Sequence, residues 1–253
     1  MKPMVQKIRL KFQRHQGLRD GVYFFLKAAG FLLAPFYGLR IKKYMGSHAT
    51  RKLQIGCGAN RLEGWLNMDL KLGRGVVFLD AGRRLPFAGE GVDYIFSEHV
   101  IEHFEYSGGM KLLRECFRVL RPGGKIRIAT PDLNFLIQLY GPNKSGLQER
   151  YKAWAVERFM PDIGIPEDAF VINHFFRAWG HRFIYDFKTL ERALIRAGFA
   201  GVRLAEVGKS HDPVFANLES HGKQIGEEFN RLETLVAEAV KPHPQETPTG
   251  GPS

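Results

Sequence analysis

The chain has 253 residues, 44% of them hydrophobic, which suffices for one α/β domain of about 200 residues plus extensions. Its only two cysteines, Cys57 and Cys116, exclude a disulfide scaffold and favour reduced thiols in a cytoplasmic protein. The net charge of +11 lies at one end, because residues 1–52 hold twelve Lys/Arg and a single acid, whereas the remainder balances at 25 basic and 25 acidic residues. A nearly neutral body argues against a broad nucleic-acid footprint, which requires clustered cations.

Residues 1–50 form a basic, aromatic N-terminal arm. Two apolar runs, 22–26 and 31–37, are separated by Lys27 and flanked by further cations. The arm is too interrupted for a membrane span, and no small-residue cleavage site follows it. Two main interpretations stay open. Residues 1–45 contact an anionic membrane peripherally, with about 1 kcal/mol from each cation, or a helix with a solvated basic face packs over the sheet or its binding cleft. RNA binding ranks third.

Apolar runs and turn signals predict an alternating α/β order over residues 51–240. Helical spacing predicts three helices, at 110–120, 187–197 and 222–239, and Arg121-Pro122-Gly123-Gly124 ends the first of them. Only about eight residues separate the first two strands, too few for a full crossover helix, so the first helix is expected to shrink to a turn. Residues 241–253 are rich in Pro, Gly and Thr and predict a disordered tail. The predicted strands are 52–55, 65–70, 76–80, 92–96, 125–130 and 201–207.

The first strand ends in Gly56-Cys57-Gly58, which is typical of a sharp turn beneath a ligand. The second and third strands end in acids, Asp69 and Asp80. Open α/β sheets bind their ligands at the carboxyl ends of the strands, and an acid there can accept both hydroxyls of a ribose. A plain structural turn is the alternative for the glycines, and a loop cap is the alternative for Asp69.

In this order the motifs resemble class I S-adenosylmethionine-dependent methyltransferases, with 55–58 as the glycine loop and 120–124 as the turn before the fifth strand. The resemblance covers residues 51–207. The nearest likeness is to predicted bacterial methyltransferases associated with polysaccharide and glycosyl-transfer genes, which carry a similar Gly-Trp-x-Asn-x-Asp segment and a similar Glu-His after the fourth strand. The family implies a Rossmann-like seven-stranded α/β methyltransferase sheet with helices on both faces.

The family also implies S-adenosyl-L-methionine as cofactor. The glycine loop underlies its methionine and ribose part, Asp69 holds the ribose, Asp80 meets the adenine, and Ala81 and Glu98 line the pocket. The cofactor-binding residues expected on this basis are Gly56, Cys57, Gly58, Asn60, Asp69, Asp80, Ala81 and Glu98.

Methyl transfer to an alcohol needs a base for the hydroxyl proton, and histidine is the usual one. His99 and His103 are the catalytic candidates because they follow the strand whose end faces the cofactor methyl group in this architecture. Residues 99–103 also spell H-x-x-E-H, the inverted zinc-protease motif, but the nearby Gly108-Gly109 leaves no long helix for it. Two alternatives remain: a divalent ion held by His99, Glu102 and His103, or side chains that only orient loops. No metal is assigned.

An insertion at about 133–186 is expected to cover the acceptor site, as in relatives. Its aromatic and polar residues suit a sugar, and the candidates for acceptor binding are His174, Arg177, Trp179 and His181. A purely structural role for His181, which would fix the loop before the next helix, is the alternative.

The expected function is O-methylation of a sugar or glycan intermediate in the cytoplasm, near the inner face of the membrane. Methylation of another small molecule is the first alternative. A non-catalytic scaffold that binds a membrane or RNA through residues 1–45 is the second.

Overall fold

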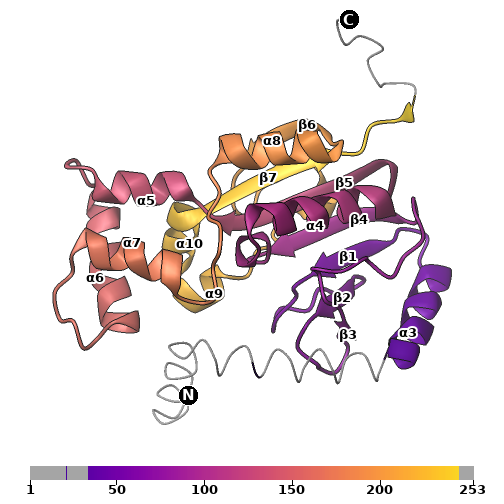
Figure 1. Ribbon diagram of the computed structural model, residues 1–253, viewed down its shortest axis with the longest axis horizontal. Helices are drawn as coiled ribbons and strands as arrows, with labels where there is room; N and C mark the ends of the chain where they lie inside the picture. The colour runs from indigo at the N-terminus through magenta and orange to yellow at the C-terminus, as the bar shows by residue number, and fades with distance from the viewer. Residues whose placement is uncertain (1–20, 22–33, 245–253) are drawn as a thin grey trace, which may run out of the picture.

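In the computed structural model, which describes Gly21 and residues 34–244, seven strands form one sheet (Figure 1). The strand order is β3-β2-β1-β4-β5-β7-β6. Strands β1 to β5 run parallel, and β7 is antiparallel to both of its neighbours. The expected Rossmann-like seven-stranded α/β sheet is confirmed, but within the described residues helices cover one of its faces and not both. The strands are β1 Lys52–Ile55, β2 Leu66–Asp69, β3 Val77–Phe78, β4 Val92–Glu98, β5 Leu120–Pro131, β6 Ala200–Ala205 and β7 Thr234–Val240.

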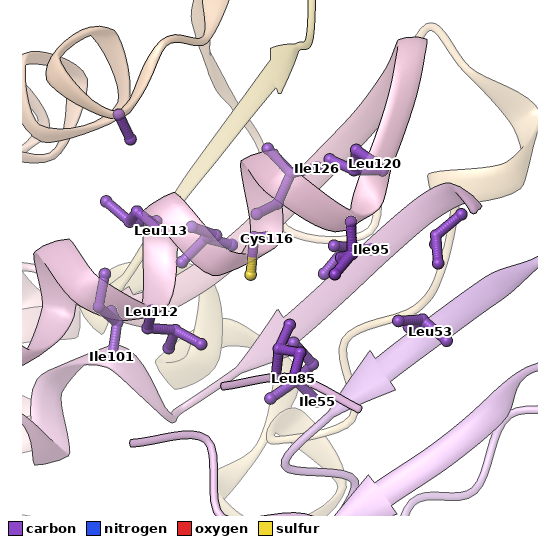
Figure 2. Close-up of a cluster of buried hydrophobic side chains, with 14 of the residues drawn as sticks. Leu53, Ile55, Leu85, Ile95, Ile101, Leu112, Leu113, Cys116, Leu120 and Ile126 are labelled. Atoms are coloured by element: carbon purple, nitrogen blue, oxygen red, sulfur yellow. The ribbon is translucent and has the colours of Figure 1, made fainter. Parts of the chain in front are cut away.

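Two helices, α4 (Tyr106–Val119) and α8 (Phe187–Ala197), cover one face of the sheet. Their apolar sides and the inward residues of β1, β4 and β5 form the main core, which Figure 2 shows around Cys116. Helix α8 begins where the Asp186 carboxylate accepts a hydrogen bond from the Thr189 amide, and it ends at Gly198, whose φ is 108°. The prediction for α8 is confirmed. Helix α4 begins four residues before its predicted start.

In the described part of the chain, the opposite face is covered mainly by the connection 206–220, whose only helical turn is the 3-10 helix η2 (Pro213–Phe215). Between β1 and β2 the described chain contains no helix, as the short spacing predicted. At the centre of this face Arg127 is fully buried. Its guanidinium donates to Glu219 and Glu238 and to the backbone carbonyls of residues 206 and 209.

The predicted helix 222–239 is wrong in its second half. The chain forms α9 (Gly222–Ile225) and α10 (Glu227–Glu233) and then continues as β7. Residues 235–239 of β7 are all buried between β5 and β6. An apolar run that is buried on both sides carries no period of two, so its sequence cannot be distinguished from a buried helix.

The insertion between β5 and α8 forms three helices at one end of the sheet, α5 (Leu133–Tyr140), α6 (Gly146–Phe159) and α7 (Asp168–Arg177) (Figure 1). They share a separate core with α10, in which Phe135, Tyr151 and Phe175 pack together. A complete capping box starts α6: the Ser145 hydroxyl accepts from the Gln148 amide, and the Gln148 side chain accepts from the Ser145 amide.

The end of the N-terminal arm forms helix α3 (Ala34–Ser47), which packs beside β3 at the edge of the sheet. The Tyr44 hydroxyl donates to a backbone carbonyl and accepts from the Lys52 amide, and Tyr37 stacks on Phe78 at 6.3 Å between ring centroids. None of the helices in the described part of the chain could cross a membrane. Residues 1–20 and 22–33 of the arm lie outside the described residues.

The predicted tail also needs a correction at its start. Lys241 is buried, with its amide donating to the Gly124 carbonyl and its ammonium donating to the Leu120 carbonyl. The sheet therefore holds this residue. Residues 245–253 of the predicted tail lie outside the described residues.

Candidate active site

The glycine loop wraps around the carboxyl end of β2. The amides of Gly56 and Cys57 both donate to the Met68 carbonyl, at 2.8 and 3.0 Å. Gly56 has a φ of 73°, and a Cβ on it would lie 2.1 Å from Cγ2 of Val100. Gly58 has a φ of 52° with open space around it. The first glycine is thus required by packing as well as by its conformation, and the second leaves room for a ligand.

Asp69, the last residue of β2, links this strand to the glycine loop. Its carboxylate accepts from the Gly58 amide at 2.8 Å and from the Lys71 amide at 2.7 Å. These bonds are the loop cap that was the alternative for Asp69. A carboxylate offers about four lone pairs, so two remain for ribose hydroxyls. The residues at this turn therefore fit the ribose of S-adenosylmethionine.

Asp80 lies beyond the end of β3, next to Ala81, which packs partly buried against the main core. Its carboxylate accepts from the Gly82 amide at 3.1 Å and lies 3.4 Å from Nε of Arg83. The Asp80 side chain is 13% exposed, so it borders the surface where an adenine could approach.

Two residues of the expected cofactor set make other contacts. The Asn60 amide donates to the Leu218 carbonyl at 3.3 Å and thereby holds the connection 206–220. Cys57 is a buried free thiol. Burial, and next the charge of Asp69, raise its pKa to about 11, so this thiol is not a nucleophile at neutral pH.

Glu98, at the end of β4, uses its carboxylate within the protein. It accepts hydrogen bonds from the backbone amide and hydroxyl of Ser220 and from the backbone amide of His221. The carboxylate thus anchors the end of the connection 206–220.

His99 and Glu102 form a pair after β4. His99 has a φ of 51°, and its Nδ1 lies 3.1 Å from Oε1 of Glu102, whose other oxygen accepts from the Thr130 hydroxyl at 3.0 Å. Burial alone would raise the pKa of Glu102, but the bond to His99 and the neighbouring histidine charges lower it to about 2. Residues 101–103 form only a 3-10 turn, so H-x-x-E-H does not lie on the long helix that an inverted zinc protease needs.

His103 and His181 face each other with ring centroids 5.3 Å apart. Nδ1 of His181 lies 2.7 Å from the Phe175 carbonyl, and burial lowers the His181 pKa to about 4, so this ring is neutral at pH 7. Trp179 packs 5.4 Å from His181 and 4.5 Å from His174. Three of the predicted acceptor residues therefore share one aromatic cluster, whereas Arg177 is exposed at the end of α7.

The structure also brings in residues that the sequence analysis missed. The His221 ring lies 4.3 Å from that of His99, and its Nε2 is 3.1 Å from Oε1 of Glu233. The buried Tyr151 hydroxyl donates to the other Glu233 oxygen. Glu233 stands in an apolar stretch, between Leu232 and Leu235, and a buried acid there was a usable signal. Nothing in the sequence connects it with His99.

Residues 71–128 match a family model described as a methyltransferase domain. Curated proteins gave no match. Among solved structures, an Archaeoglobus fulgidus SAM-dependent methyltransferase is similar, with 18% identity, a TM-score of 0.45, and coverage of 85% of this chain and 94% of that one. A possible histamine N-methyltransferase of Thermotoga maritima has 15% identity, a TM-score of 0.44, and coverage of 91% and 97%.

A phosphoethanolamine N-methyltransferase of Haemonchus contortus, solved with S-adenosyl-L-methionine, has 18% identity and a TM-score of 0.41. The match covers 81% of this chain, which spans about half (52%) of the Haemonchus protein. At these identities and TM-scores, the structures add nothing about the acceptor. The methyltransferase model thus matches the part of the chain from the residues after β2 into β5, within the seven-stranded sheet.

Proposed function

We propose that the enzyme methylates an oxygen of a sugar or glycan intermediate. The observation that carries the proposal is the arrangement at the carboxyl ends of the strands. The glycine loop and Asp69 follow β1 and β2, and histidines follow the neighbouring strand β4. S-adenosylmethionine supplies an electrophilic methyl group, and the protein has to align the acceptor oxygen at about 3 Å and remove its proton.

Of the two catalytic candidates, His103 suits the role of general base better. Its ring is partly exposed and faces His181, which is neutral. The His99 ring has Nδ1 turned to Glu102 and its Nε2 buried. We therefore assign proton removal from the acceptor to His103 and a positioning role to His99.

The sugar acceptor is supported by the chemistry of the insertion. Trp179, His174 and His181 offer flat apolar faces together with ring nitrogens, a combination that suits the C–H and O–H groups of a sugar. Arg177, exposed on the same helix, can meet an anionic group such as a sugar phosphate. Acceptors of another small-molecule class are the alternative outcome of the screen below.

Calorimetric titration with S-adenosylhomocysteine tests the cofactor site without an acceptor. Micromolar binding is expected for the wild type, with at least a tenfold loss for Asp69→Asn and Asp80→Ala. The matched control is Glu63→Ala, at an exposed acid in the β1–β2 connection, which should bind as the wild type does. No binding by folded wild-type protein would favour the non-catalytic scaffold.

Turnover with sugar nucleotides and glycan intermediates then tests the acceptor. His103→Gln should lower kcat about 100-fold, which is within the usual range for a general base. The affinity for S-adenosylhomocysteine should stay unchanged. Full activity in His103→Gln would remove the base assignment. Activity with non-sugar alcohols only would refute the proposal of a sugar acceptor.

We also propose that the arm makes a peripheral contact with the inner face of an anionic membrane, which would place the enzyme in the cytoplasm. The observation that favours it is the free side of α3, where Phe36 is 73% and Leu39 68% exposed beside the exposed Lys42 and Lys43. Phe36→Ser/Leu39→Ser should reduce sedimentation with anionic vesicles several-fold, and Ile195→Ser, at an exposed residue of α8, should not. Equal sedimentation of both variants would refute the contact.

A further inference from the structure

We propose that His99, His221 and Glu233 form a binding site for one Zn²⁺-class divalent metal ion. The three residues come from separate elements: the end of β4, the residue before α9 and the last residue of α10. Their ligand atoms all lie within 4.8 Å of one another. This site goes beyond the proposed methyl transfer and does not depend on it.

The buried Nε2 atom of His99 is the first argument. Within the described residues it has no hydrogen-bond partner, although its solvent-accessible area is negligible. The other nitrogen, Nδ1, lies 3.1 Å from Oε1 of Glu102. With a carboxylate oxygen as the acceptor, the donated ring proton lies on Nδ1 and the lone pair lies on Nε2. A buried lone pair needs a partner, and a metal ion supplies one.

The supports behind the ligands are the second argument. Metal-binding histidines usually donate their other ring N–H to a carboxylate or carbonyl, as His99 does to Glu102. Glu233 is held by the Tyr151 hydroxyl on one oxygen, so the other oxygen points to His221. The backbone amide of His221 is itself fixed on Glu98. Each ligand is therefore positioned by a partner outside the set.

The donor set decides the kind of metal. Two imidazoles and one carboxylate are a common set for catalytic zinc, whereas Mg²⁺ and Ca²⁺ prefer oxygen donors alone. Zn–N distances of about 2.1 Å in a tetrahedral site put the donors about 3.4 Å apart. His221 Nε2 and Glu233 Oε1 are already 3.1 Å apart, and the ion would replace the proton between them. Three protein ligands leave one position for water.

A second group, Glu102 with His103 and His181, also has ligand atoms within 4.8 Å. It is the weaker candidate because both oxygens of Glu102 already accept hydrogen bonds, from His99 and from Thr130. Nor is an unpartnered nitrogen of His103 or His181 buried in the described structure. Glu102 is therefore better placed as the support of His99 than as a ligand.

The test uses the full chain, which is first treated with EDTA and then dialysed against Zn²⁺. Inductively coupled plasma mass spectrometry then measures the amount of metal bound per chain. Wild type should hold one Zn²⁺ per chain, and Co²⁺ should give a visible absorption band that millimolar Mg²⁺ does not displace. His221→Gln and Glu233→Gln should each weaken binding at least 100-fold, and Tyr151→Phe about tenfold, as for other supports of metal ligands.

The controls are His181→Gln, in the other group, and His211→Gln, at an exposed histidine. Both should keep one Zn²⁺. Loss of metal in His181→Gln with retention in His221→Gln would overturn the site and favour the second group, and wild type without stoichiometric Zn²⁺ would refute it outright. Titration with S-adenosylhomocysteine reports folding of each variant and the cofactor site separately, so a failed metal site is distinguishable from a failed cofactor site.

Discussion

Replacement of Arg127 by methionine should be among the most destabilising single changes in this protein. The side chain is fully buried on the face of the sheet that the connection 206–220 covers in the described structure. Its Nε donates to Glu219 at 2.5 Å, and the guanidinium also donates to Glu238 and to the carbonyls of residues 206 and 209. Methionine fills a similar volume but leaves two carboxylates without this cation.

The expected loss of stability depends on the contacts that the two carboxylates keep after Arg127 is replaced. Removing one partner of a buried ion pair costs about 3 to 5 kcal/mol. Two contacts reduce it here: Glu238 keeps Arg203, with Nη2 at 2.5 Å, and Glu219 keeps the Gly208 amide at 2.9 Å. We therefore expect the free energy of unfolding to fall by about 3 kcal/mol. At about 2 to 4 °C per kcal/mol for a chain of this size, the Tm should drop by about 6 to 12 °C.

Urea unfolding followed by circular dichroism, together with thermal melts, would measure this change. The matched control is Arg121→Met, because Arg121 is 61% exposed and its buried partner Asp93 keeps the Arg51 amide at 2.7 Å. Loss of such an exposed cation should cost about 1 kcal/mol or less. Adding Glu219→Gln to Arg127→Met should restore part of the loss by removing an unpaired charge. If Arg127→Met is no less stable than Arg121→Met, or the added Glu219→Gln lowers stability further, the reasoning is wrong.

Three further outcomes are expected. Gly56→Ala should weaken S-adenosylhomocysteine binding at least tenfold more than Gly58→Ala, because only the first new Cβ meets a side chain at 2.1 Å; equal losses in calorimetry would contradict this. Gly109→Ala would put a methyl group 2.4 Å from the Tyr185 hydroxyl and should lower the Tm. Tyr185→Phe should restore the Tm of that variant. Alone, Tyr185→Phe should leave the Tm unchanged, because its hydroxyl is buried without a hydrogen-bond partner in the described structure; no restoration would contradict the clash. The His181 pKa is lowered to about 4 by burial, so the unfolded chain binds this proton first and stability should fall as the pH drops from about 6.5 to 4. His181→Gln should flatten that slope in urea titrations of EDTA-treated protein, and an unchanged slope would exclude the histidine as its source.

The sequence predicted the elements whose chemistry is local. Strand β4 and the turn at Gly56 were predictable because apolar runs and paired glycines act within a few residues. Helix α8 was predictable because Asp186 and Gly198 mark its two ends. The missing helix after β1 followed from chain length alone.

What the sequence did not predict depends on partners far along the chain. Val236 continues the helical spacing of Phe229 and Leu232 but lies in a strand, since β5 and β6 bury both of its sides. Glu98 follows the fourth strand as a cofactor residue of the family would, and its carboxylate also accepts from Ser220, which lies 122 residues later. No local pattern reports such a pairing.

The connection 206–220, which covers the second face of the sheet in the described part of the chain, also reaches the candidate site. Three consecutive residues link that face to the candidate site: Glu219 binds the buried Arg127, and the amides of Ser220 and His221 bind Glu98. A displacement of Glu219 therefore also displaces Ser220 and His221, because consecutive Cα atoms lie at a fixed distance from one another. Arg127→Met should thus loosen His221 and weaken Zn²⁺ binding without touching any proposed ligand. Exposed Arg121→Met, which lies outside this link, should leave the metal in place.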